Sequence, residues 1–274
     1  SWYNIKKLSI SRLNQTPSKL LHLSTTLAHE NAYLNQIIIF KSMALIYGIA
    51  DSERQLLNKL PNEVQDIDDM GRVKKEFENK LANEGSGFFA GIRKWNYKRQ
   101  VDKFEKSEVK LFQKGTRGEN EVIDELSKLD DSYHILCGVD IELDYWVTYN
   151  GRKNLKSAQM DLIVVCPKGI FMIEVKNWSN QFANNNSNNN FSPYEQTERA
   201  GRVLWISLQK VIKNVRVTNI LLSIKGNLPY NESYRSVYVS SLDKINNFLE
   251  KRQDEFNKNE VEKIVKSLNG FVTK

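Results

Sequence analysis

Cysteine is scarce in this 274-residue chain, since only Cys137 and Cys166 occur, each inside an apolar run typical of a strand. Two buried free thiols in a reducing compartment are therefore expected, in preference to a disulfide. The N-terminal residues also lack the charged-then-apolar pattern of a signal peptide. We accordingly expect a cytoplasmic protein.

Long apolar runs are missing as well. The most apolar stretch, residues 37–50, includes Lys41 and is shorter than the ~20 apolar residues that span a bilayer. The sequence contains no phosphate loop of the Gly-x-x-x-x-Gly-Lys-Ser/Thr kind, which argues against a built-in ATPase. We therefore predict neither a transmembrane segment nor an ATPase site.

Basic residues are in excess, and they are unevenly placed. The net charge is +7 and the pI about 9.1, which is compatible with a polyanionic partner. Residues 88–114 contain eight Lys/Arg against three acidic residues and so supply +5 of this charge. The cations of this segment that we predict to contact nucleic acid are Arg93, Lys94, Lys98 and Arg99.

Three interpretations of this basic segment remain open. In the first interpretation the segment binds nucleic acid: its cations contact phosphates, and Trp95 or Tyr97 stacks on a base. Alternatively, the segment forms a helix on a membrane surface, which uses the same residue types. In the third interpretation it is a solvated basic helix whose aromatic side chains pack inward.

The first 113 residues have a helical pattern. Leucine and isoleucine recur at helical spacing from Leu20 to Leu45, Pro61 interrupts the pattern, and residues 64–81 indicate a further helix. We expect an all-helical N-terminal region, residues 1–113, that serves regulation, oligomerisation or docking on nucleic acid. A homo-oligomer formed through these helices is one expectation.

From Gly115 onward the pattern changes to alternating helices and strands. A short amphipathic helix is predicted to begin at residues 116–119, and a second helix runs from Pro193, which follows the capping residue Ser192, to about Asn214. The strand-like runs are 133–137, 139–143, 145–149, 160–166, 170–176, 218–224 and 236–240. This order, closed by two short helices, predicts an α/β domain with a mixed central sheet over residues 114–274.

One hairpin concentrates the chemistry. Residues 160–166 and 170–176 flank a predicted tight turn at Pro167 and Lys168. A two-residue loop places Asp161 opposite Glu174, and a bulge would shift the register by one residue. Because side chains alternate along a strand, Glu174 and Lys176 share one face.

Two carboxylates opposite one another repel unless a cation lies between them. Hard oxygen ligands favour Mg²⁺ or Mn²⁺, which would polarise a scissile phosphate and lower the pKa of a bound water. Lys176 would help to position that water. A Glu-x-Lys pattern by itself is far more typical of a solvated strand edge, and Asp161 opposite it raises the weight of a functional site.

Glu119 and Gln196 are further candidates. Glu119 precedes Val122 and Ile123 by three and four residues, so it lies on the apolar face of its helix and needs a partner such as a metal. The alternative is a glutamate that stabilises a helix N-terminus. Gln196 begins the apolar face of the second helix, either at the site or at the edge of the core.

Four motifs together resemble the nuclease-related domain (NERD) family, a branch of the PD-(D/E)xK superfamily. In chain order they are Gly118-Glu119, Gln159-x-Asp161 with the apolar run after it, Gly169-Ile170-Phe171-Met172-Ile173-Glu174-Val175-Lys176-Asn177-Trp178, and Pro193-x-x-Gln196. The resemblance covers roughly residues 114–240. It implies a restriction-endonuclease-like fold, in which a mixed sheet is flanked by helices.

The resemblance also implies roles for these residues. Glu119, Asp161 and Glu174 are expected to bind the metal, Lys176 to be the catalytic lysine and Gln196 to be an accessory residue. Leu162 stands where family members often have a histidine, so that imidazole is absent here. We expect a Mg²⁺- or Mn²⁺-dependent nuclease, and a DNA endonuclease in particular because the superfamily mostly acts on DNA. An RNase and a non-catalytic nucleic-acid-binding or assembly protein are the alternatives.

Overall fold

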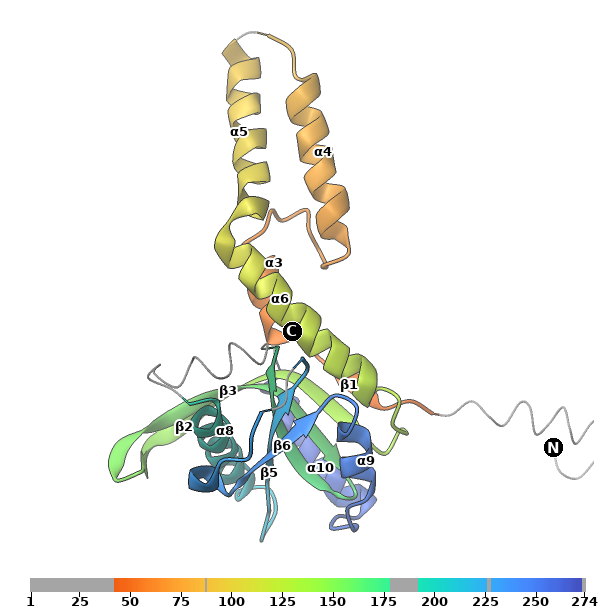
Figure 1. Cartoon of the computed structure of the whole chain (residues 1–274), viewed down its shortest axis with the longest axis vertical. Coiled ribbons are helices and arrows are strands. Elements are labelled where there is room, and N and C mark those ends of the chain that lie inside the picture. Colours follow the sequence, from red (N-terminus) through yellow and green to blue (C-terminus); the bar gives the residue numbers. More distant parts are fainter. Residues whose placement is uncertain (1–41, 87, 178–191, 226–227, 273–274) are drawn as a thin grey trace, which may run out of the picture. The chain divides into compact units, whose positions relative to one another are not determined.

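The computed structural model describes residues 42–86, 88–177, 192–225 and 228–272. Within them, residues from Met43 onward form one compact unit. The described helices are α3 (Asp51–Leu57), α4 (Asp69–Asn83), α5 (Phe88–Glu105), α6 (Ser107–Leu126), α8 (Pro193–Leu208), α9 (Ile245–Glu250) and α10 (Lys258–Leu268) (Figure 1). The strands are β1 (Leu45–Tyr47), β2 (His134–Tyr149), β3 (Arg152–Cys166), β4 (Gly169–Lys176), β5 (Thr218–Ser223) and β6 (Val237–Ser241), and a 3-10 helix, η2, spans Glu232–Tyr234.

The six described strands form one mixed sheet in the order β1-β2-β3-β4-β5-β6. Strands β2, β3 and β4 are antiparallel, whereas the pairs β1–β2, β4–β5 and β5–β6 are parallel. The predicted mixed sheet is confirmed. The three runs predicted between residues 133 and 149 are one long strand, β2.

Helices cover both faces of the sheet, as predicted (Figure 1). On one face, Ile163 and Val165 of β3 pack with α8 and α10. On the other, Leu162 and Val164 pack with α6 and α9. This alternation along β3 is what a strand buried on both faces requires, and it explains its continuous apolar run.

The prediction of an all-helical N-terminal region is wrong at Leu45–Tyr47, which form the edge strand β1 beside β2. Residues 1–41 lie outside the described part of the chain. Residues 51–113 contain α3, α4, α5 and the start of α6, as expected, but residues 58–68 between α3 and α4 are not helical. These four helices share a small apolar core that includes Leu56, Val73, Phe77 and Phe104.

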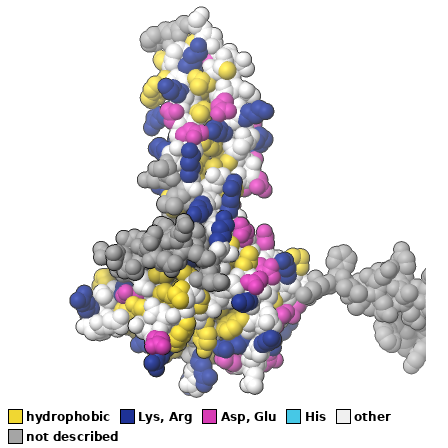
Figure 2. Space-filling view, viewed as in Figure 1, with side chains coloured by type: hydrophobic (Ala, Val, Ile, Leu, Met, Phe, Trp, Pro, Cys, Tyr) yellow, Lys and Arg dark blue, Asp and Glu magenta, His cyan; other side chains and the backbone are white. Residues whose placement is uncertain are grey.

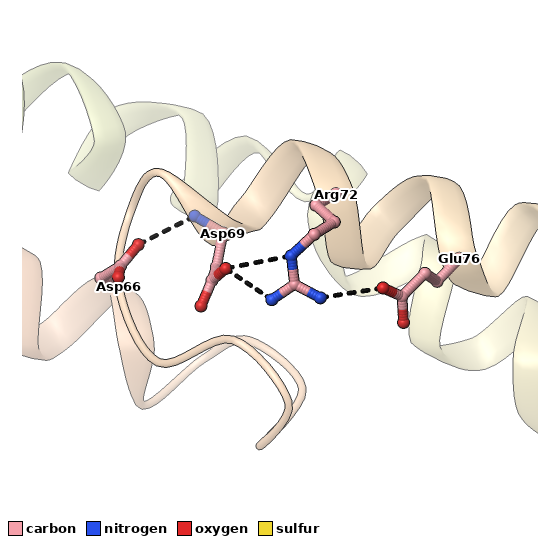
Figure 3. Close-up of polar contacts among 4 residues, drawn as sticks. All are labelled: Asp66, Asp69, Arg72 and Glu76. Atoms are coloured by element: carbon pink, nitrogen blue, oxygen red, sulfur yellow. Dashed lines mark hydrogen bonds and ion pairs between the residues drawn. The ribbon is translucent and has the colours of Figure 1, made fainter.

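The start of α4 is fixed by charged side chains (Figure 3). The Asp66 carboxylate accepts the backbone N–H of Asp69 at 2.8 Å. Arg72 donates to Asp69 at 2.5 Å and to Glu76 at 2.8 Å. These contacts order the first turns, although exposed pairs of this kind contribute only about 0.3–0.5 kcal/mol each.

Helix α6 is longer than the sequence predicted. It begins at Ser107 rather than at residues 116–119, and it therefore crosses the expected domain boundary between residues 113 and 114. Its first part packs in the helical core through Val109, while Val122 and Leu126 pack against the sheet. The helical segment and the sheet are thus joined by one continuous helix.

Both cysteines are buried and free, as predicted. Burial raises the pKa of each thiol, Cys137 and Cys166, to about 12, so the thiolates that would react are disfavoured. Among the helices that the structure describes, none has the length and hydropathy needed to cross a bilayer.

Candidate active site

A cavity of about 500 Å³ opens where α3, α6, β3, β4 and α8 meet. It is lined by all the catalytic residues that the sequence predicted, namely Glu119, Asp161, Glu174, Lys176 and Gln196. These residues come from four different elements, so the fold brings together positions that are far apart in the sequence.

The hairpin places its acids as a two-residue loop requires. Cys166 pairs with Gly169 and the register continues to Leu162 opposite Ile173, so the next positions on the two strands are Asp161 and Glu174. The turn therefore consists of Pro167 and Lys168, without a bulge.

Hydrogen bonds hold these side chains in place. The Asp161 carboxylate accepts the Val175 backbone N–H at 2.7 Å. Lys176 Nζ donates to Glu174 Oε1 at 2.6 Å and to Gln196 Oε1 at 3.2 Å. Gln196 lines the cavity and links α8 to the ammonium on β4, so it does not merely lie at the edge of the core.

Burial and the charges of neighbouring groups shift the pKa values of the hairpin residues. Burial, and then the charges of Glu174 and Glu119, raise the pKa of Asp161 well above its ordinary value. Burial lowers the pKa of Lys176, but the attraction of Glu174 and Asp161 outweighs it and raises the pKa above the ordinary value. Lys176 is therefore a stable cation.

One oxygen of Glu174 has no hydrogen-bond partner within the described structure. Glu174 is only 2% exposed, and its Oε2 is buried without a donor. An unsatisfied buried carboxylate oxygen is costly unless a ligand satisfies it. With Asp161 beside it, this oxygen fits a hard divalent cation.

Glu119 faces the same cavity but is held by α3. Ser52 donates its hydroxyl to Glu119 Oε1 and its backbone N–H to Oε2 at 3.4 Å. Burial raises the pKa of Glu119 to about 7, although the hydrogen bonds from Ser52 oppose this shift. Glu119 lies well inside α6, so a role in stabilising the helix N-terminus is excluded.

Across the described ranges, no three His, Cys, Asp or Glu side chains are grouped so that they would hold a metal ion together. Asp161 and Glu174 are adjacent, whereas the carboxylate of Glu119 is directed to Ser52. The predicted role of Glu119 as a metal ligand stays a prediction.

A close approach of α6 to the sheet explains the glycine before Glu119. A Cβ atom on Gly118 would lie 2.8 Å from Ile224 Cδ1 and 3.0 Å from Asn177 Cβ. Asn177 also donates to the Lys114 carbonyl at 3.0 Å. Any side chain at position 118 would therefore push α6, and Glu119 with it, away from the end of β4.

The model of the nuclease-related domain family (NERD) matches residues 114–224. This match covers less than half of the chain, and we refer to residues 114–224 as the nuclease-related domain. The matched segment includes Glu119, Asp161, Glu174, Lys176 and Gln196. The comparisons with curated proteins and with solved structures gave no match.

Sequence reasoning missed the part of the site that lies outside the nuclease-related domain. Asp51, Ser52 and Gln55 of α3 line the cavity. Ser52 and Gln55 resemble a capping box in sequence, but the N-cap of α3 is Ala50 and no side-chain cap bond forms. Only the contact between Ser52 and Glu119, 67 residues apart, reveals this role.

The predicted nucleic-acid contacts lie on α5, and none of them lines the cavity of the nuclease-related domain. Arg93 pairs with Glu84 at 2.8 Å, and the Arg99 guanidinium lies 5.6 Å from the Trp95 ring centre. The inward-packing interpretation holds for Tyr97, which contacts Phe77, but not for Trp95, which is 64% exposed. Figure 2 shows Lys and Arg interleaved with Asp and Glu over these helices, not one uniform basic patch.

Proposed function

We propose that the nuclease-related domain is a metal-dependent nuclease that hydrolyses phosphodiester bonds, with DNA as the substrate and internal cleavage as its mode. The observation that supports this proposal most directly is the arrangement of Asp161, Glu174 and Lys176 in one cavity. A buried carboxylate, a partly buried one beside it and a fixed ammonium are costly to fold, and they suit the binding of a cation and a phosphate.

The donor set fits Mg²⁺ or Mn²⁺. Asp161 and Glu174 would hold the ion, because Glu174 Oε2 is buried without a partner among the described residues, and Glu119 is a further acid of the same cavity. Carboxylate oxygens are the ligands that these hard cations prefer. When bound, such an ion supplies polarisation of the scissile phosphate and neutralisation of its charge.

Lys176 and Gln196 would act on the attacking water and the phosphate. The carboxylates of Glu174 and Asp161 raise the pKa of Lys176, which supports a role for its ammonium in orienting the attacking water and offsetting charge on the phosphate. Gln196 holds the ammonium in place. The water oxygen bonds to phosphorus and loses a proton to solvent, while the opposite P–O bond breaks and the sugar oxygen leaves and takes up a proton.

All these groups act on the phosphate, so the chemistry itself is indifferent to the sugar. DNA is favoured by the superfamily that the motifs resemble, and RNA is the alternative substrate.

Cleavage of a fluorescent duplex DNA oligonucleotide in Mg²⁺ or Mn²⁺ tests the proposal. We expect cleavage by the wild type that a chelator stops and that Asp161→Asn abolishes. Asp140→Asn is the matched control, since Asp140 is an exposed aspartate on β2. Metal-independent cleavage, or full activity in Asp161→Asn, would contradict the assignment. Cleavage of RNA alone would replace DNA as the substrate.

A second candidate is a non-catalytic assembly or binding protein whose helices form a homo-oligomer. One observation favours it: Phe89, Ile92 and Trp95 recur at three-residue spacing on α5 and are 72%, 53% and 64% exposed. An exposed apolar stripe of this kind is typical of an interface. Sedimentation at high concentration tests it: loss of self-association in Ile92→Glu would support the interface, and a wild-type monomer would exclude it.

A further inference from the structure

A second cavity, of about 710 Å³, lies between the edge strand β6 and helix α9. Ser240 and Ser241 of β6 line one side, and Asn247 and Phe248 of α9 line the other. Strand β6 is the last strand of the described sheet (Figure 1). The groove lies outside residues 114–224, so the family match assigns it no role.

The groove begins at the same end of the sheet as the candidate active site. Strands β4, β5 and β6 are parallel, and Lys176 pairs with Ser223, which pairs with Ser241. Two strand spacings separate Lys176 from Ser241, or about 10 Å. That distance corresponds to about three nucleotides at the ~3.4 Å rise per strand of a duplex, and to fewer in an extended strand.

The charge of the groove is of one sign. Lys244, Lys251 and Arg252 line it, and none of its described lining residues is acidic. One acid lies at the margin of the groove: the Asp243 carboxylate, which is not itself part of the lining, accepts the hydroxyl of the lining residue Ser241 at 2.6 Å. A positively charged lining matches the phosphates of a nucleic acid. It would also match an acidic peptide, so the aromatic residues of the groove are what favour nucleic acid.

Aromatic rings accompany these cations. Tyr230 lines the groove and is 61% exposed. The Arg252 guanidinium lies 5.3 Å from the Phe248 ring centre and 5.9 Å from that of Tyr238, which fixes its position. Cations that follow a backbone, together with exposed rings on which bases stack, are the features by which proteins bind single-stranded nucleic acid.

We propose that this groove binds a single strand of nucleic acid on one side of the cleavage site, with Lys244, Lys251 and Arg252 on its phosphates and Tyr230 stacked on a base. The inference rests on the proposed nuclease function, because the strand is the continuation of the substrate from Lys176. It adds a binding surface that the nuclease-related domain alone does not contain.

Fluorescence anisotropy with a labelled single-stranded DNA oligonucleotide in EDTA tests the inference without cleavage. In the Lys244→Ala/Lys251→Ala variant we expect Kd to rise about tenfold and the slope of log K against log salt to fall by about 1.4, or about 0.7 for each lost phosphate contact. Tyr230→Ala should raise Kd about tenfold with the slope unchanged. Lys263→Ala/Lys266→Ala, which removes two exposed lysines from α10, is the charge-matched control and should bind as the wild type does.

Wild-type affinity and slope in the Lys244→Ala/Lys251→Ala variant would overturn the inference, even if the wild type cuts DNA. Loss of self-association in that variant, with oligonucleotide binding unchanged, would assign the groove to a second copy of the chain and also overturn it. Groove-dependent binding by a protein that cuts no nucleic acid would support the inference while contradicting the nuclease. Thermal unfolding of each variant excludes misfolding as the cause.

Discussion

At the scale of single residues, the site is a set of charges that the fold holds at some cost. Asp161 and Glu174 are neighbours across the β3–β4 hairpin, and each carboxylate has one nearby donor, the Val175 N–H or the Lys176 ammonium. Glu174 Oε2 has no partner among the described residues. Stability alone does not explain these two carboxylates, because two apolar side chains of similar size at the same positions would make the protein at least as stable.

Lys176→Ala is expected to lower metal-dependent cleavage by about a hundredfold or more, because a fixed cation at the reacting phosphate is removed. Lys168→Ala is the matched control on the same hairpin. Lys168 lies at the turn, beyond the opposite end of β4 from Lys176, and does not line the cavity, so its removal should leave cleavage unchanged. Initial rates at saturating Mg²⁺ compare the two variants, and equal rates would remove Lys176 from the mechanism.

Ser52→Ala is expected to destabilise the protein by about 1–3 kcal/mol, because the buried Glu119 carboxylate loses its hydroxyl donor. Ser52→Thr should recover much of the loss, since it keeps the hydroxyl. Denaturant unfolding without metal measures the difference. The control is Ser157→Ala, which removes an exposed hydroxyl on β3, and a loss of the same size there would refute the role of Ser52.

At the scale of elements, the close approach of α8 to β5 positions Gln196. A Cβ atom on Gly201 would collide with the side-chain amide of Asn219. Asn219 is 8% exposed, so its amide has little room to move away. A glycine inside a helix is intrinsically unfavourable, and here packing is the reason for it.

Gly201→Ala should therefore destabilise the protein by about 1–3 kcal/mol through overpacking. Gly71→Ala in α4 is the matched control, because nothing lies within 4 Å of its added Cβ. There the better helix propensity of alanine should stabilise the protein by up to about 1 kcal/mol. Thermal unfolding shows whether each substitution raises or lowers stability. If Gly201→Ala raised it, α8 would be able to move away from Asn219, and the overpacking argument would be wrong.

The elements also show what local sequence can and cannot predict. The β3–β4 hairpin was predictable because its two strand-like runs and its turn residues are local sequence signals. Together they predicted the register that places Asp161 opposite Glu174. The start of α6 was missed because Gly115 and Gly118 favour a helix boundary locally, whereas in the fold Gly118 lies mid-helix to allow contact with Ile224. Strand β1 was missed because three residues carry too little pattern to outweigh the apolar run around them.

At the scale of the whole molecule, the nuclease-related domain is completed by a segment outside it. Helix α3 packs through Leu56 in the helical core and presents Ser52 to Glu119. Helix α6 continues from that core into the sheet domain. The sequence predicted a helical N-terminal region separate from the nuclease-related domain, but the hydrogen bond from Ser52 to Glu119 connects the two. No local sequence pattern could have predicted this contact, because the two residues are 67 positions apart.

Leu56→Ala should lower the free energy of unfolding by about 2–5 kcal/mol, because Leu56 is fully buried. It should also lower cleavage, since α3 carries the donor to Glu119. Val73→Ala in α4 is the control: it is buried in the same core but on a helix that does not line the site. Loss of stability in both, with loss of cleavage only in Leu56→Ala, would support the coupling; equal cleavage in both would contradict it.

The central claim is that Asp161, Glu174 and Lys176 form a metal-dependent nuclease centre, and nicking of supercoiled plasmid DNA tests it most directly. Wild type, Glu174→Gln and Lys176→Ala are compared in Mg²⁺ or Mn²⁺, with and without chelator. The account predicts nicking by the wild type alone, abolished by the chelator, and the closed circular substrate would identify an endonuclease. Nicking at close to the wild-type rate in either variant, or a wild type that binds DNA and RNA but cuts neither, would contradict it.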